Sequence, residues 1–351
     1  MAAVLRRRIL DAVSLSVFLI AACSQHPPAS TQTGNQKSWA AVYFSDPNAL
    51  GAEFLQGGPD EPLQAAIEAA RLSVDVAAYD LNLYNIRDAL IAAQERGLQV
   101  RLVIESDNLA DVEIQQMIAA GIPVVSDKDS DYMHDKFVLI DRYEVWSGSM
   151  NYTLSDAYGN RNNLIVLRST RLAENYLAEF EEMFVQGLFG AGSPRNTPYP
   201  QVEVDGHLVE TYFSPEDDTQ ERLVDLLNGA QESIYFLAFS LTSDELASAL
   251  VAAQQRGVEV RGVMDKSQAS NQGGEFENLA QHGIDVRLDG EGGSMHNKVL
   301  IIDGAIVVTG SYNFSANAEE SNDENSLIIY DADLAKKYSE EFWRIWKLAL
   351  K

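Results

Sequence analysis

The chain has 351 residues, of which 46% are hydrophobic and 22% are charged, and its formal net charge at pH 7 is −26. This composition excludes a disordered or fibrous protein, and the length favours two domains of ordinary size. The strong negative charge disfavours nonspecific binding to nucleic-acid phosphates, which needs many Lys and Arg contacts, although a cleft with a few concentrated positive charges can still hold one phosphate group.

Residues 1–22 are predicted to be a secretion signal. Three arginines at 6–8 precede an apolar run at 12–20, which is too short to span a bilayer. The run leads into the sequence IAAC at 20–23, which resembles the lipobox of bacterial lipoproteins, in which the cysteine is acylated. Because Cys23 is the only cysteine, it is predicted to be a lipid attachment point, and the alternative is an ordinary secretion signal with a stray cysteine.

Residues 23–38 are predicted to be a flexible tether, because the segment is polar and rich in Pro, Ser, Thr and Gln. A lipid on Cys23 would anchor the protein to a membrane on its extracytoplasmic side. In a Gram-negative cell this would be the outer membrane, facing the periplasm, but the sequence leaves the envelope type open.

The remainder of the chain contains an internal repeat, which predicts the same fold for both halves. The sequence MHDKFVLIDRYEVWSGSMN at 133–151 is matched by MHNKVLIIDGAIVVTGSYN at 295–313. Both contain the frame H-x-K-x4-D-x6-G-S-x-N. A segment rich in Gly and Pro at 190–207 is the predicted linker, which leaves an N-terminal domain at 39–189 and a C-terminal domain at 208–351.

Within each half, short β-prone runs alternate with amphipathic helical segments. In chain order the predicted elements of the first half are a strand at 72–81, a helix at 86–97, a strand at 98–105, a central strand at 136–141 and a final helix at 171–184. The second half repeats this order at 232–241, 244–257, 258–265, 298–303 and 333–350. This alternation predicts two tandem α/β sandwich domains, each with a mixed sheet.

The duplicated frame has the groups that cleavage of a phosphodiester needs. Alternate residues of a strand share a face, so His134 lies beside Lys136 and His296 beside Lys298. One neutral histidine can attack phosphorus to form a phosphohistidine, while the other, protonated, donates its proton to the leaving alcohol and later deprotonates water. Positive charge stabilises the phosphoryl oxygens, and the mechanism requires neither metal nor cofactor.

The Gly-Ser-x-Asn turn that closes each frame supplies compact polar side chains. We therefore predict that the phosphate is bound by the two lysines together with the following four residues: Ser149, Asn151, Ser311 and Asn313.

The paired H-x-K-x4-D and G-S-x-N motifs resemble those of the phospholipase D superfamily, and the similarity extends from about Ala40 to the C-terminus. The resemblance implies that the two motif histidines meet at a pseudo-twofold interface within one chain. The enzyme would therefore be a monomer with an internal pseudo-dimer. It also implies that the motif aspartates Asp141 and Asp303 belong to the site as structural supports.

The two copies differ after the G-S-x-N turn, where members of this family often carry a carboxylate that orients a histidine. Glu324 is the predicted orienting residue, and alignment of the following apolar residues places Arg161 at the matching position. His134 would then be oriented by Asp156 or Asn160. The resemblance favours His134 as the nucleophile, whereas support of His296 by Glu324 would favour His296, so the sequence leaves both assignments open.

Three functions are compatible with these motifs. The first is a membrane-tethered phospholipase D that hydrolyses phospholipid headgroups, and the alternative enzyme is an extracytoplasmic endonuclease with the same chemistry, which the net charge disfavours. The third is a tethered binding module without activity, which is disfavoured by the intact motifs. His26, His207 and His282 are predicted to lie outside the site.

Overall fold

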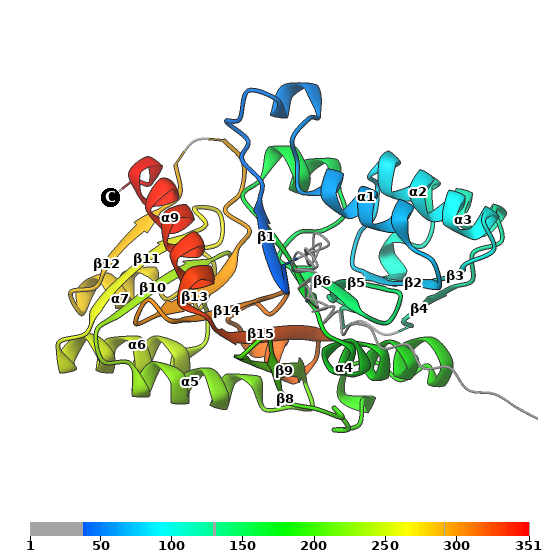
Figure 1. The fold of residues 1–351 in the computed structure, drawn as a ribbon. Coiled ribbons are helices and arrows are strands. Elements are labelled where there is room, and N and C mark those ends of the chain that lie inside the picture. The colour runs from blue at the N-terminus through cyan, green and yellow to red at the C-terminus, as the bar shows by residue number, and fades with distance from the viewer. Residues whose placement is uncertain (1–37, 129–130, 291, 351) are drawn as a thin grey trace, which may run out of the picture. The chain divides into compact units, whose positions relative to one another are not determined.

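The computed structural model describes residues 38–128, 131–290 and 292–350 (Figure 1). The predicted signal, Cys23 and the tether before Ser38 lie outside the described residues. No helix within the described ranges is both long enough and apolar enough to cross a bilayer.

The first half forms a seven-stranded mixed sheet in the order β1-β7-β6-β5-β2-β3-β4, in which β2, β3 and β4 are parallel and the other pairs antiparallel. The strands are β1 (Ala40–Phe44), β2 (Ser73–Ala78), β3 (Gln99–Ile104), β4 (Val124–Ser126), β5 (Lys136–Ile140), β6 (Glu144–Gly148) and β7 (Asn163–Arg168). Its helices are α1 (Asp60–Ala69), α2 (Tyr84–Glu95), α3 (Val112–Ala119) and α4 (Thr170–Glu181).

The second half repeats this topology in an eight-stranded sheet, β12-β11-β10-β13-β14-β15-β9-β8. The strands are β8 (Gln201–Val204), β9 (His207–Ser214), β10 (Ser233–Ala238), β11 (Glu259–Met264), β12 (Asp285–Leu288), β13 (Lys298–Ile302), β14 (Ile306–Gly310) and β15 (Glu324–Tyr330). Its helices are α5 (Thr219–Gly229), α6 (Asp244–Arg256), α7 (Phe276–Gln281), α8 (Ala316–Glu320) and α9 (Ala332–Leu348). The predicted fold class is confirmed.

Local sequence explains where the repeated helices begin and end. The Ser243 hydroxyl accepts a hydrogen bond from the Leu246 amide at the start of α6, and the helix stops at Gly257, whose φ of 95° suits a residue without a side chain. The central strands β5 and β13 are buried along their whole length, which is why their sequences are continuously apolar after the lysine.

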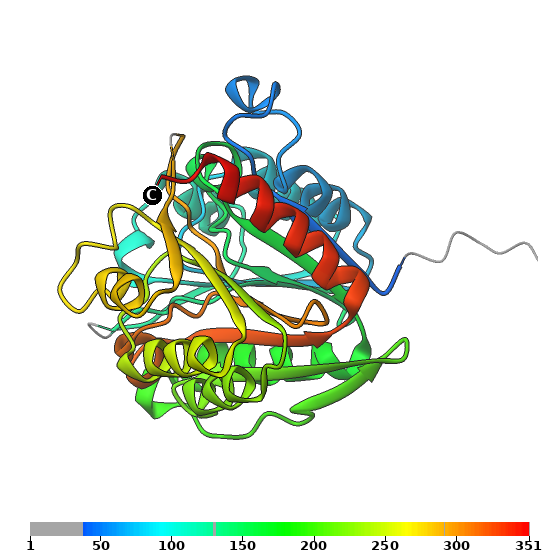
Figure 2. The same cartoon turned by 90° about the vertical axis from the view of Figure 1, so that its left-hand side faces the viewer.

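Three hydrophobic cores divide the molecule into layers. Helices α1, α2 and α3 cover the outer face of the first sheet, and α5, α6 and α7 cover that of the second. The inner faces of both sheets pack together in one shared core, which also takes in α4 and α9. Figure 2 shows α9 on the opposite side of the second sheet from α5 and α6.

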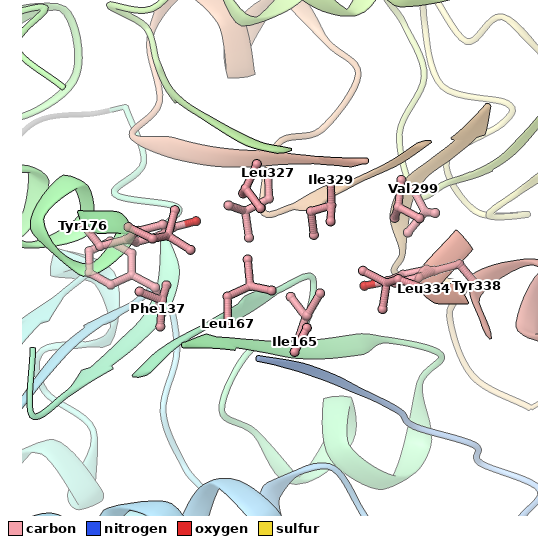
Figure 3. Close-up of a cluster of buried hydrophobic side chains, with 14 of the residues drawn as sticks. Phe137, Ile165, Leu167, Tyr176, Val299, Leu327, Ile329, Leu334 and Tyr338 are labelled. Carbon is pink, nitrogen blue, oxygen red and sulfur yellow. The ribbon is translucent and has the colours of Figure 1, made fainter. Parts of the chain in front are cut away.

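The shared core joins the two halves into one body. Leu167 and Ile165 from the first half lie across from Leu327 and Ile329 of the second (Figure 3). The described residues accordingly form one compact unit, in which the two repeated domains share a core. The structure also differs from the predicted linker, because β8 lies inside it; the alternating burial of Val202 and Val204 shows the strand period that the sequence analysis overlooked.

We predict that Leu327→Ala destabilises the whole protein by about 2–5 kcal/mol, because Leu327 is fully buried between the sheets and its truncation leaves a cavity. Urea unfolding followed by circular dichroism measures the loss, with Leu208→Ala on the exposed part of β9 as the control. Two separate unfolding transitions, one of them insensitive to Leu327→Ala, would contradict a common core.

Candidate active site

The two motif histidines lie at the interface of the halves, each two residues before a central strand. His134 donates its backbone N–H to the carbonyl of Asp323 at 3.0 Å, and His296 donates its own to the carbonyl of Arg161 at 2.9 Å. Each histidine loop is therefore held by the opposite half. Both imidazoles are almost buried, with 11% and 10% of their side-chain surfaces exposed.

Each histidine is oriented by a residue of the opposite half. Nδ1 of His134 lies 2.8 Å from Oε2 of Glu324, and Nδ1 of His296 lies 2.9 Å from Oδ1 of Asn162. Glu324 thus orients a histidine as predicted, but the proposal that it supports His296 is wrong. In both rings Nδ1 is used for orientation, which leaves Nε2 as the nitrogen for chemistry.

Strand pairing corrects the sequence alignment in this region by one residue. Gly148 pairs with Leu164 and Gly310 with Ser326, so the two copies superpose at an offset that puts Asn162 at the place of Glu324. Arg161 is the counterpart of Asp323 instead. The alignment of the apolar residues failed because both strands are buried on both faces, so neither has the alternation that would fix its register.

Asp156 lies beside His296 and not beside His134, so the predicted orientation of His134 by Asp156 or Asn160 is also wrong. Oδ2 of Asp156 is 3.4 Å from Nδ1 of His296, and its carboxylate accepts hydrogen bonds from the Asn151 amide and the Asn160 side chain. Burial opposes ionisation, but His296 and these donors outweigh it and keep the pKa of Asp156 well below its usual range. A carboxylate charge therefore faces His296.

The lysines are buried next to their own histidines. Nζ of Lys136 donates to the carbonyl of His134 at 2.6 Å, and Nζ of Lys298 donates to that of His296 at 2.8 Å. Each ammonium has two further N–H donors. Burial lowers the pKa of Lys136 to about 8, and burial together with Lys136 lowers that of Lys298 to about 7.

The environments of the two imidazoles differ in charge. Burial, followed by Lys136 and Lys298, holds the pKa of His134 well below its usual value. Burial and Lys298 also lower the pKa of His296, but Asp156 opposes that shift directly. Burial raises the pKa of Glu324 to about 7. The site therefore favours neutral imidazole at His134 and supports the protonated form better at His296.

The glycines of the G-S-x-N turns allow close packing against the backbone of the neighbouring strand. A side chain at Gly148 would place its Cβ 2.4 Å from the carbonyl oxygen of Asn163, and at Gly310 2.1 Å from that of Asn325, so only glycine fits. Ser149, whose side chain is fully buried, donates to Oδ1 of Asn162.

The serines of the two turns have a different role from the predicted one. Ser311 is fully buried, and its hydroxyl accepts a hydrogen bond from the Asn325 amide and interacts with Glu324. Ser149 and Ser311 therefore hydrogen-bond to the residues that orient the histidines, Asn162 and Glu324, and do not face the phosphate as predicted. The buried Oδ1 atoms of Asn151 and Asn313 accept no hydrogen bond from the described residues.

The motif aspartates lie directly after β5 and β13, at the opposite ends of these strands from the histidines, and act as supports. Asp141 accepts hydrogen bonds from the backbone amides of 71–73, and Asp303 accepts them from those of 231–233. Each fixes the loop before a central strand, β2 or β10. Their structural role is the one that the resemblance implied.

Sequence reasoning missed two further pairs of site residues. Asn163 and Asn325 bridge the halves, since their amides donate to Asn297 at 2.9 Å and to Asp135 at 2.6 Å. Tyr79 packs edge-on against the His134 ring, with 5.0 Å between the ring centroids. Phe239 packs in the same way against His296, with 4.6 Å between the centroids. Their occurrence at matching places in both copies was the signal that could have found them.

Comparison with known proteins places the chain in a family. The family model described as "Cardiolipin synthase, PLD-like domain" matches the chain twice, at 63–184 and 223–346. The fold and the paired histidine sites define an enzyme that cleaves phosphodiesters. The chain belongs to the phospholipase D superfamily and is a phosphodiesterase of phospholipase D type.

Individual relatives match parts of the chain. A phospholipase D of Rickettsia felis is 34% identical over 163 residues, which cover 46% of this chain and 82% of that protein. The mitochondrial cardiolipin hydrolase of Xenopus laevis is 38% identical over 131 residues, or 37% of this chain and 62% of that protein. A solved phosphatidylserine synthase of Haemophilus influenzae has the same fold at 15% identity, with a TM-score of 0.66 and coverage of 88% of this chain and 87% of that one.

We predict that Lys298→Met raises stability and abolishes activity. The wild-type lysine is charged in the unfolded chain up to about pH 10.4, whereas its folded-state pKa is about 7, so holding it charged in the site below pH 7 opposes folding. The stability gain should therefore be largest below pH 7 and should shrink as the pH rises from 7 to 10. Urea unfolding of both proteins at pH 6.5 and 9.5 measures the difference, and a gain that grows with pH would contradict this assignment.

Proposed function

We propose that the enzyme hydrolyses the headgroup ester of phospholipids, with His134 as nucleophile and His296 as general acid and base. The observation that supports these roles is the asymmetry of the Nδ1 partners. Glu324 accepts a hydrogen bond from Nδ1–H of neutral His134, so that the Nε2 lone pair is available for attack, while Asp156 favours the imidazolium of His296.

The reaction has two displacements at phosphorus. Nε2 of His134 forms a bond to phosphorus as the bond to the headgroup oxygen breaks, and Nε2–H of His296 transfers its proton to that oxygen. The neutral His296 then takes a proton from water, whose oxygen attacks phosphorus and breaks the P–N bond. Phosphatidate leaves, and both histidines return to their starting states.

The buried cations and amides stabilise the charge that develops on phosphorus. Lys136 and Lys298 each retain two N–H donors after bonding to a carbonyl, and both are buried, so their charges act in a medium of low polarity. The side-chain amides of Asn151 and Asn313 would donate to the non-bridging oxygens after their oxygens turn away.

A lipid substrate agrees with the charge of the chain and with the names of the relatives. A formal charge of −26 repels a polyanion such as DNA over a wide surface but does not oppose a zwitterionic headgroup. Proteins similar to part of the chain are named phospholipase D and cardiolipin hydrolase. Acylation of Cys23 would hold the enzyme, as a monomer containing both histidines, at an extracytoplasmic membrane surface.

Headgroup release from phosphatidylcholine and phosphatidylethanolamine vesicles should proceed in EDTA and should fall by about 10³-fold in His134→Ala and His296→Ala. Plasmid nicking under the same conditions tests the endonuclease alternative. His282→Ala, which changes an exposed histidine outside the site, is the matched control. Nicking without headgroup release would replace the lipid by nucleic acid as substrate.

The covalent intermediate should form on His134. Rapid quenching in alkali, in which phosphohistidine is stable, followed by peptide mass spectrometry should find the adduct on His134 in wild type and no adduct in His134→Ala. Glu324→Gln should lower the rate of its formation. An adduct on His296 that is absent from His134 would reverse the two roles.

A further inference from the structure

Three glutamates meet near the C-terminal end of α4, and none of them belongs to either histidine motif. Glu179 belongs to α4, Glu182 begins the π-helical turn that follows (Glu182–Gln186), and Glu216 lies in the loop between β9 and α5. One carboxylate oxygen of each lies within 4.8 Å of the others. The cluster therefore joins the end of the first half to the start of the second.

Glu179 and Glu182 are buried and Glu216 is half-buried, and the polar groups beside them are Asn196 at Glu182 and Glu179 at Glu216. Glu182 is 1% exposed, and neither of its oxygens has a hydrogen-bond partner of good geometry, although the Asn196 amide lies close enough to oppose the rise of its pKa. Oε2 of Glu216 is also buried without a partner. Among the described residues, no Lys, Arg or His forms an ion pair with any of the three glutamates.

Such a group of carboxylates is costly unless a cation or protons neutralise it. Burial of one unpaired carboxylate already costs several kcal/mol, and three within contact distance add mutual repulsion. The inward orientation of Glu182, with both oxygens unused, points to a missing ligand rather than to a solvated acidic surface.

We propose that Glu179, Glu182 and Glu216 bind a structural Ca²⁺ ion. The donor set contains only oxygen, which hard divalent cations prefer. Ca²⁺ tolerates irregular coordination by carboxylates, whereas Mg²⁺ demands near-ideal octahedral geometry and keeps most of its water. Water would complete the coordination of Ca²⁺ by the three glutamates.

The ion would fasten the two halves together next to the catalytic machinery. Glu216 follows β9, and β9 pairs with β15, where Ser214 lies opposite Glu324. None of the three glutamates contacts either motif histidine, so the ion acts on stability and takes no part in the reaction.

Calcium binding is tested on the full chain, purified in EDTA and dialysed. Addition of CaCl₂ at about 100 times its dissociation constant should raise the Tm by about 5 °C, and native mass spectrometry should show one bound Ca²⁺. Glu182→Gln should lose both effects. Glu174→Gln, an exposed residue of the same helix, should keep them. Glu216→Gln, in a loop, gives the second test if Glu182→Gln does not fold.

The outcomes separate a cation site from carboxyls that share protons. Absence of bound Ca²⁺ and of a Tm shift in wild type would overturn the proposal, as would a Ca²⁺-dependent shift that survives in Glu182→Gln and Glu216→Gln. Below the Tm of the calcium-free protein, hydrolysis should persist in EDTA, because the ion does not touch the histidines. Failure of this site would therefore leave the proposed catalytic function unaffected.

Discussion

Packing of the two sheets through one shared core is the interaction on which the site depends. The inner faces of both sheets, together with α4 and α9, exclude water from a single apolar layer, and burial of this surface is the main favourable term that holds the halves together. The loops before β5 and β13 meet only because of this packing. Each loop is then completed by backbone and side-chain hydrogen bonds from the opposite half, so neither half alone contains a finished histidine site.

The cost of this arrangement is concentrated in the ionisable groups at the interface. Two lysines, two histidines and several carboxylates are buried close together, and burial alone disfavours the charged form of each. Their arrangement is tolerated because opposite charges and backbone carbonyls lie beside each cation. The surrounding apolar core supplies the stability that the site gives up, which is the usual relation between a strained site and its scaffold.

Duplication within one chain allows the two histidines to diverge. In a symmetric pair, both imidazoles would have the same partner and the same pKa. Here Glu324 faces His134, whereas Asn162 and Asp156 face His296, so the two rings have different charges around them. One chain thereby supports two distinct roles at phosphorus, which is the physical advantage of fusing the two copies.

The sequence by itself determined the repeated α/β fold, the paired histidines and lysines, and the family, because these depend on periodicity and on motifs that are local in the chain. It did not determine which residue orients which histidine. Glu324 lies 190 residues from His134, and the register of the buried strands β7 and β15 has no alternation to reveal it. The roles of Ser149 and Ser311, the bridging by Asn163 and Asn325, and the meeting of Glu179, Glu182 and Glu216 were likewise decided only by tertiary structure. All of them depend on how one half packs on the other. The two sheets pack through apolar faces, and the local sequence of one face does not specify which residues of the other face it contacts.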